Sequence, residues 1–309
     1  MKKSITFIAL FLALSALSSE AQREHRERRQ RQDLGDTVYG TADDGTPLKW
    51  KVFPGAGSGP HPALLVIHGG DFNMTPRSPK TIQSARDAAA AGFNAFLVEY
   101  RLSPPSALAG QKSNGRYPDQ TNDLKLAVRE ARKYPGGNGK VGAIGGSAGG
   151  SHDVYLAATG TKGDDRLDAA VALSGVYDFT DKRSLGQQRF WRIVQNYVGS
   201  SSPEDLRKAS PITYVDASVA PLYVIASDND TMPPEQYSDL VRRLEEVGAT
   251  NFKQRLRTNS QQHSFSCWPE VKDEVLDFLR EHLDKEAGLA TASVTPTPIA
   301  SATPSATAR

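Results

Sequence analysis

Residues Gly145–Gly149 read G-G-S-A-G and match the pattern G-x-S-x-G around Ser147. A serine hydroxyl becomes an effective nucleophile when a positioned imidazole takes its proton. An apolar, strand-like run precedes the pattern and a helix-forming run follows it, a context in which the serine lies on a sharp turn. A small phosphate-binding turn is the alternative interpretation. The context predicts a nucleophile, whose histidine and carboxylate partners must come from elsewhere in the chain.

One of the six histidines stands where it could activate Ser147. His263 follows the last predicted strand, and loops at the carboxyl ends of parallel strands carry active-site groups. His152 follows the serine on the same predicted helix, which directs its side chain away from the serine oxygen. The remaining histidines lie in a basic linker, between prolines, in a glycine-rich loop and near the end of the last helix: His25, His61, His68 and His282. We therefore expect His263 to be the base.

A carboxylate is needed to fix the tautomer of this histidine and to stabilise its imidazolium form. The polar loop Ser227–Pro233 follows the apolar run 222–226 and offers two candidates, Asp228 and Asp230. Both fit the chain order serine, aspartate, histidine. We favour Asp230 as the acid of the triad and assign Asp228 to stabilising the loop.

The oxyanion formed when a serine attacks a carbonyl needs preorganised N–H donors. The backbone N–H of Ala148, directly after Ser147, is one candidate. The turn His68–Asp71 is the second source, because its glycines let the backbone approach a substrate. A plain glycine turn after a strand is the alternative interpretation of that segment.

Strand-like and helix-like segments alternate around these residues. A hairpin is predicted first, from Val38–Tyr39 and Leu48–Phe53 on either side of the turn Asp43–Gly45. Buried strands are predicted at the apolar runs 63–67, 93–98, 141–144, 169–173, 222–226 and 252–256. Helices are predicted at 78–91, 124–131, 237–247 and 271–279 and directly after Ser147. This alternation predicts an α/β fold with a mostly parallel sheet and helices on both faces.

The segment Asp178–Pro211 interrupts the alternation. Its residues Phe190, Val194 and Tyr197 have helical spacing. Two interpretations stay open: an ordinary helix that faces the core, and a small cap over a pocket.

Composition and spacing exclude several classes of protein. The 309 residues contain 37 Lys and Arg against 35 Asp and Glu, and this near-neutral balance argues against a nucleic-acid binder. The single cysteine, Cys267, excludes an internal disulfide and a cysteine-based zinc cluster, and we interpret it as a packed thiol. Residues Gly137–Gly142 match G-x-G-x-x-G, but they precede a strand, so no dinucleotide cradle is predicted.

The two ends of the chain differ in composition from its middle. Residues 1–21 combine a positive start, an apolar run and small residues before a cleavage site, which predicts a signal peptide, with a membrane anchor as the alternative. Residues 22–33 predict a basic linker, and residues 287–309, rich in Ala, Thr, Ser and Pro, predict a disordered tail. The catalytic domain is then 34–286. We expect a secreted or periplasmic protein that is not inserted in a membrane once the signal is removed.

Taken together, these residues resemble an α/β-hydrolase of the hormone-sensitive-lipase and small bacterial carboxylesterase type, a group that includes acetyl xylan and feruloyl esterase-like enzymes. The resemblance runs from about Leu48 to Leu283. Its motifs are His68–Gly70, Tyr100–Pro104, Tyr117–Asp119 with Asp123, Gly146–Gly150, Leu173–Asp178, Ala209–Ile212, Asp228–Asp230 and His263–Phe265.

The resemblance implies site residues and an activity. It implies that Asp230, the second aspartate of its D-x-D motif, is the acid, and that Gly70 and Asp71 join Ala148 as donors of the oxyanion hole. Many members of the family have a third glycine where this chain has Asp71, whose carboxylate would oppose a developing anion unless it points away. Tyr100, Arg101 and Asp123 are interpreted as structural support.

We expect a secreted serine carboxylesterase that acts through an acyl-enzyme, without metal or cofactor, on a small or polysaccharide-linked ester. Short-chain or aromatic acyl esters of plant polysaccharide are the expected substrates. An amide-cleaving relative, such as an arylformamidase or a serine peptidase, and an inactive binding protein of the same fold are the alternatives.

Overall fold

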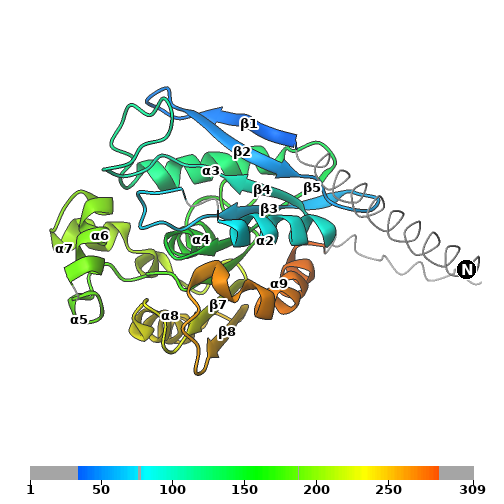
Figure 1. The fold of residues 1–309 in the computed structure, drawn as a ribbon. Helices are drawn as coiled ribbons and strands as arrows, with labels where there is room; N and C mark the ends of the chain where they lie inside the picture. Colours follow the sequence, from blue (N-terminus) through cyan, green and yellow to red (C-terminus); the bar gives the residue numbers. More distant parts are fainter. Residues whose placement is uncertain (1–33, 76–77, 187, 285–309) are drawn as a thin grey trace, which may run out of the picture.

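A computed structural model describes residues 34–75, 78–186 and 188–284 of the chain. Its centre is an eight-stranded sheet with the strand order β1-β2-β4-β3-β5-β6-β7-β8 (Figure 1). The strands are β1 (Leu34–Thr41), β2 (Pro47–Phe53), β3 (His61–Ile67), β4 (Asn94–Val98), β5 (Gly137–Gly146), β6 (Ala169–Leu173), β7 (Leu222–Ser227) and β8 (Phe252–Arg257). The helices are α2 (Pro79–Ala90), α3 (Asp119–Arg132), α4 (Ala148–Ala158), α5 (Lys182–Leu185), α6 (Gln188–Val198), α7 (Pro203–Ala209), α8 (Pro234–Glu246) and α9 (Trp268–Leu283), with 3₁₀ turns η1 (Pro211–Tyr214) and η2 (Ser264–Cys267).

The strand pairing confirms the predicted fold class. Strands β1 and β2 form an antiparallel hairpin, and β2 joins β4 antiparallel. The other pairs, from β4 and β3 through to β7 and β8, are parallel. Strand β5 begins at Gly137, four residues before the predicted run 141–144, because Gly137 pairs with His61 of β3. The glycine pattern 137–142 therefore lies within this strand.

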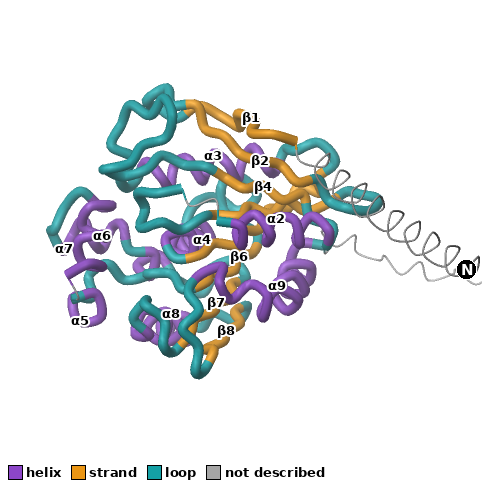
Figure 2. The backbone as a smooth tube through the Cα atoms, viewed as in Figure 1, coloured by secondary structure: helices purple, strands orange, loops and turns teal. Residues whose placement is uncertain are grey.

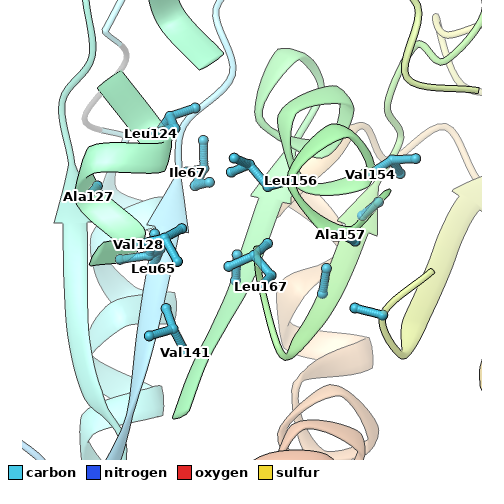
Figure 3. Close-up of a cluster of buried hydrophobic side chains, with 14 of the residues drawn as sticks. Leu65, Ile67, Leu124, Ala127, Val128, Val141, Val154, Leu156, Ala157 and Leu167 are labelled. Atoms are coloured by element: carbon cyan, nitrogen blue, oxygen red, sulfur yellow. The ribbon is translucent and has the colours of Figure 1, made fainter. Parts of the chain in front are cut away.

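Helices cover both faces of the sheet because the central strands are apolar on both sides (Figure 2). Successive side chains of β3 point to opposite faces. Leu65 and Ile67 belong to a buried apolar cluster that also contains residues of α3, α4 and α8, and part of this cluster is drawn in Figure 3. Leu64 and Val66 pack with α2 and α9. All four side chains are fully buried, and each burial contributes about 1.5–3 kcal/mol.

The segment between β6 and β7 forms the helices α5, α6 and α7, which gather at one side of the sheet (Figure 1). Val194 and Tyr197 of α6 are buried in a separate apolar cluster that also contains Phe72 and Ala148. Arg189 and Phe190, near the start of the same helix, line a cleft. Both interpretations of this segment therefore hold in part: α6 has a core-facing side, and its first turn borders a pocket.

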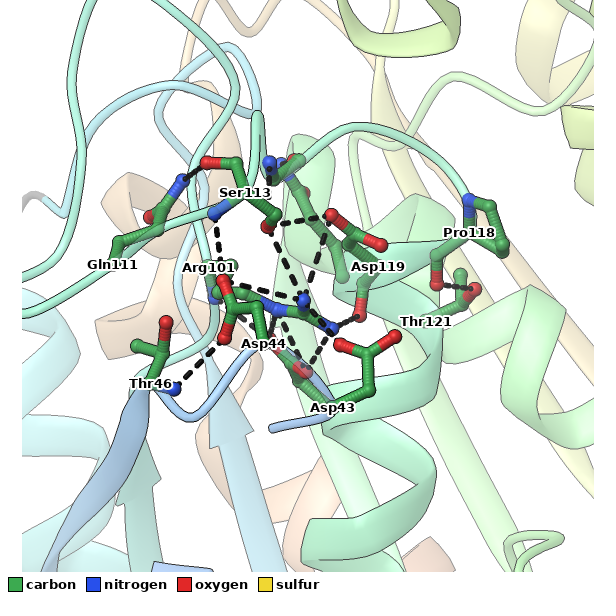
Figure 4. Close-up of polar contacts among 12 residues, drawn as sticks. Asp43, Asp44, Thr46, Arg101, Gln111, Ser113, Pro118, Asp119 and Thr121 are labelled. Atoms are coloured by element: carbon green, nitrogen blue, oxygen red, sulfur yellow. Dashed lines mark hydrogen bonds and ion pairs between the residues drawn. The ribbon is translucent and has the colours of Figure 1, made fainter. Parts of the chain in front are cut away.

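A buried ion pair supports the loops at the carboxyl edge of the sheet. The guanidinium of Arg101, which follows β4, binds the carboxylate of Asp123 on α3 at 2.8 Å, and the two side chains are only 1% and 2% exposed. Figure 4 shows Arg101 among further acidic side chains, including Asp43, with which it forms a 2.6 Å contact. Burial alone would lower the pKa of Arg101, but its carboxylate partners raise it above its ordinary value. Next to it, Tyr100 stacks on His68 and donates to the His68 carbonyl at 2.8 Å.

No helix within the part of the chain described here is long and apolar enough to cross a membrane. The predicted signal peptide (1–21), basic linker (22–33) and tail (287–309) lie outside the described residues.

Candidate active site

Ser147 lies on the sharp turn between β5 and α4 that its sequence context predicts. Its backbone has φ 56° and ψ −121°, a conformation that costs about 1–3 kcal/mol for a residue other than glycine. A Cβ at Gly145 would lie 2.3 Å from the Gly149 carbonyl oxygen, and a Cβ at Gly149 would lie 2.1 Å from the Ile67 carbonyl oxygen. The turn therefore needs glycine at both positions, which is the physical content of the G-x-S-x-G pattern.

His263 and Asp230 form a hydrogen-bonded pair. The imidazole Nδ1 lies 2.8 Å and 3.0 Å from the two carboxylate oxygens. With Nδ1–H donating to Asp230, the neutral ring keeps its Nε2 lone pair free to accept a proton. The Asp230 side chain is 1% exposed, whereas 31% of the His263 side chain faces solvent. Burial alone would raise the pKa of Asp230, but His263, the Ser174 hydroxyl and the Met232 amide together lower it below its ordinary value.

Asp228 binds backbone instead of the imidazole. Its carboxylate accepts hydrogen bonds from the amides of Asn259 at 2.9 Å and Ser260 at 3.1 Å. These hydrogen bonds lower its pKa. The structure thus brings Asp230 to His263 and leaves Asp228 holding the loop that carries the histidine.

A second brace of the histidine loop was missed by the sequence analysis. Arg257, at the end of β8, is 6% exposed, and its guanidinium donates to the Ser227 hydroxyl and the Gln262 side chain, both at 3.0 Å. It also pairs with Glu270 of α9. The Ser227 hydroxyl in turn donates to the Gln262 carbonyl at 2.9 Å. The sequence feature that could have indicated this brace is an arginine at the end of a strand, just before the histidine loop.

The histidine loop also touches the serine turn. A Cβ at Gly146 would lie 1.9 Å from the hydroxyl oxygen of Ser264, the residue after His263. Ser264 itself has φ 55°, a left-handed conformation. Ser147 and His263 line one cleft of about 490 Å³, a volume suited to a small ligand.

The loop after β3 passes beside the serine. A Cβ at Gly69 would lie 2.9 Å from the Ser147 Cβ, so this close approach requires glycine. Gly70 and Asp71 line the cleft, with φ 104° and 54°. Ala148 is the first residue of α4, where backbone N–H groups lack partners within the helix and suit a negative charge. All six predicted site residues therefore lie at or next to this cleft.

The side chains around the cleft differ in character. Met74, Phe190 and Phe265 contribute apolar surface, whereas Lys80 and Arg189 contribute positive charge. Across residues 34–75, 78–186 and 188–284, no cluster of three or more His, Cys, Asp or Glu side chains is arranged to hold a metal ion.

Two other reactive side chains are held in inert states. His152 is fully buried, and its Nε2 lies 3.1 Å from the Gln120 side-chain oxygen. Burial lowers the pKa of His152 to about 3, so its ring is neutral. Cys267 is buried, and burial raises the pKa of its thiol to about 11. The buried thiol confirms the interpretation of Cys267, and the His152 ring lies against Gln120 of α3.

Comparison with known proteins identifies the family of this chain and two relatives that are named esterases or ester hydrolases. The BD-FAE family matches residues 52–244, more than half of the chain. Esterase LipC of Mycobacterium tuberculosis is 28% identical over 207 residues, which are 61% of this chain and 49% of LipC. The probable carboxylic ester hydrolase LipM of the same organism is 26% identical over 62% of this chain and 46% of LipM. The chain thus spans about half the length of the curated relatives it matches.

Solved structures share the fold at low sequence identity. Esterase Est2 of Thermogutta terrifontis superposes with a TM-score of 0.63 and 19% identity, over 82% of this chain and 95% of that one. An acetyl ester-xyloside bifunctional hydrolase of Caldicellulosiruptor lactoaceticus superposes with a TM-score of 0.64 and 16% identity, over 80% of this chain and 96% of that one.

Proposed function

Because the chain belongs to the BD-FAE family, we propose that it is a serine carboxylic-ester hydrolase that acts through an acyl-enzyme. The observation that carries the proposal is the 2.8 Å contact between His263 and Asp230 beside the cleft that contains Ser147. A histidine held in this tautomer, next to a serine raised on a strained turn, is the arrangement that activates a hydroxyl for acyl transfer.

In this mechanism the Ser147 oxygen attacks the ester carbonyl carbon while His263 Nε2 takes the hydroxyl proton. The carbonyl oxygen becomes an oxyanion, which the backbone N–H groups of Ala148, Gly70 and Asp71 stabilise. Collapse of this tetrahedral intermediate breaks the bond to the alcohol oxygen, which receives the proton from His263. Water then attacks the acyl-enzyme by the same route, and His263 returns the proton to the serine oxygen. Asp230 stays ionised and stabilises the imidazolium form throughout.

We propose short-chain or aromatic acyl esters of plant polysaccharide as substrates. The apolar side chains of Met74, Phe190 and Phe265 in the cleft support a small apolar acyl group. Among the proteins of the same fold are an acetyl ester-xyloside hydrolase and a carbohydrate esterase from gut microbiota. Acetylated and feruloylated xylan fragments are the substrates to test first.

We also propose that the enzyme acts after export, in the periplasm or outside the cell. The charged start, apolar run and small residues of positions 1–21 support this proposal. Mass spectrometry of the protein recovered from the periplasm or the medium is expected to give the mass of the chain without residues 1–21. Full-length protein in the membrane fraction would favour an anchor instead.

Covalent labelling tests the reaction class. A fluorophosphonate probe is expected to label the purified protein, and Ser147→Ala should abolish both labelling and hydrolysis of 4-nitrophenyl acetate. Ser238→Ala is the matched control, because this exposed serine of α8 donates only to a carbonyl of its own helix. Absence of labelling in the unaltered protein would favour an inactive binding protein. Labelling with faster turnover of formamides or peptides than of esters would favour the amide-cleaving alternative.

A further inference from the structure

Asp71 places a carboxylate on the loop that borders the oxyanion. A carboxylate carries a negative charge, which raises the energy of the transition state when it lies near a developing oxyanion. The residue lines the cleft and 75% of its side chain is shielded from solvent, since 25% is exposed. An active enzyme with this residue therefore needs a feature that offsets its charge.

The structure contains a cation in contact with this carboxylate. The guanidinium of Arg189 lies 3.2 Å from an Asp71 oxygen and donates a hydrogen bond to it. Arg189 belongs to the first turn of α6 and lies 118 residues from Asp71 along the chain. It also lines the cleft, so the ion pair borders the space in which the substrate would react.

Helix α6 is anchored to the same loop at a second point. The Phe72 ring stacks on Tyr197 of α6 with 4.0 Å between the ring centroids and an interplanar angle of 11°. Both side chains are 1% exposed. The Phe72 carbonyl accepts a hydrogen bond from the Ser103 amide at 3.0 Å. This buried contact fixes the loop and the helix relative to each other, and Arg189, nearer the start of the helix, reaches the carboxylate from that anchored position.

We propose that Arg189 is a positioning residue that draws the Asp71 carboxylate toward α6 and offsets its charge, so that an aspartate can be tolerated in the oxyanion loop. The inference rests on the proposed function, because it assumes that the backbone around Asp71 borders an oxyanion. It adds a residue to that function: a side chain of the segment between β6 and β7 takes part in the electrostatics of the reaction. Arg189 is 73% exposed, so solvent and salt screen the pair, and the effect should be modest and salt-dependent.

A double-mutant cycle tests the proposal. Arg189→Gln removes the cation and leaves Asp71 uncompensated, and we expect kcat for 4-nitrophenyl acetate to fall about fivefold at low ionic strength, with a smaller loss at high salt. Asp71→Asn keeps the size and tolerates the left-handed backbone. In the double variant the loss caused by Arg189→Gln should disappear, and kcat should be within about twofold of that of the Asp71→Asn enzyme. The expected fivefold loss corresponds to about 1 kcal/mol of coupling between the two side chains. Arg183→Gln is the matched control, because this cation of α5 is 93% exposed and lies 3.6 Å from a different carboxylate, Asp181.

The outcomes separate the inference from the proposed function. Restored kcat in the double variant, together with salt-dependent loss in Arg189→Gln alone, supports the inference. Equal losses in the single and double variants overturn it, because Arg189 would then act independently of Asp71. An unchanged Arg189→Gln enzyme overturns it as well. An unaltered protein that neither hydrolyses the ester nor reacts with fluorophosphonate contradicts the proposed function itself.

Discussion

Replacing Asp230 by asparagine tests the central arrangement of the site. The change keeps the shape of the side chain but removes its negative charge from the partner of His263. The original carboxylate is 1% exposed and 2.8 Å from the imidazole, so little water can take its place. We expect Asp230→Asn to fold normally and to lose most of its kcat.

The size of the loss follows from the geometry. When His263 takes the serine proton, it becomes a cation whose charge centre lies about 4 Å from the carboxylate, and at an effective dielectric constant near 20 their attraction is about 4 kcal/mol. Without that attraction the barrier rises by a similar amount, and 1.36 kcal/mol corresponds to a factor of ten. The variant should therefore be slower by about a thousandfold. Because the loss is specific to the charged transition state, KM should change far less than kcat.

Asp228→Asn is the matched comparison. The two aspartates are in the same loop, but the partly exposed Asp228 carboxylate accepts hydrogen bonds from the amides of Asn259 and Ser260 and from the Asn229 side chain. Its replacement should loosen the histidine loop and reduce kcat by about tenfold or less, since each exposed hydrogen bond contributes about 1 kcal/mol. Steady-state hydrolysis of 4-nitrophenyl acetate, with circular dichroism to verify folding, measures both. A thousandfold loss in Asp228→Asn with a minor loss in Asp230→Asn would refute the reasoning.

Two further predictions concern residues beside the nucleophile. Gly146→Val should reduce kcat by about tenfold or more while the protein stays folded. A Cβ at this site lies 1.9 Å from the Ser264 hydroxyl oxygen, so the valine side chain would occupy the space of that hydroxyl and displace the histidine loop. The same valine should be tolerated better in a Ser264→Gly background, and equal losses of kcat in both backgrounds would contradict this contact. Asp153 of α4 is fully buried with neither carboxylate oxygen hydrogen-bonded, and burial raises its pKa well above the ordinary value, an effect that the nearby Gly145 amide only partly offsets. Because the pKa of Asp153 is raised in the folded protein, this carboxyl ionises first in the unfolded chain as pH rises above about 4, and the folded state of the unaltered protein loses stability. The gain in the free energy of unfolding that Asp153→Asn brings, measured by urea unfolding, should therefore grow by about 1.4 kcal/mol per pH unit from there. A gain that stays constant between pH 4.5 and 7 would contradict this prediction.

Local residue patterns determined most of the fold. Strand β6 coincides with the predicted run 169–173, because an apolar segment between polar turns is buried on both faces wherever it lies in a parallel sheet. The serine turn was predictable for a similar reason. A side chain at Gly145 would clash with Gly149 in the same turn, and a side chain at Gly149 would clash with Ile67 at the end of the neighbouring strand β3. The start of β5 was not, because Gly137 extends the strand only by pairing with β3.

The sequence by itself determined which residue types are available for catalysis and the order in which the strands deliver them to one edge of the sheet. Only the tertiary structure decided which of two aspartates reaches His263, because Asp228 and Asp230 are two residues apart in one loop and differ only in where that loop turns them. The same is true of the brace from Arg257 and of the Asp71–Arg189 pair, whose members are 118 residues apart. Such contacts depend on directions in space that no spacing along the chain encodes, because loops from separate strands meet only after the sheet has formed.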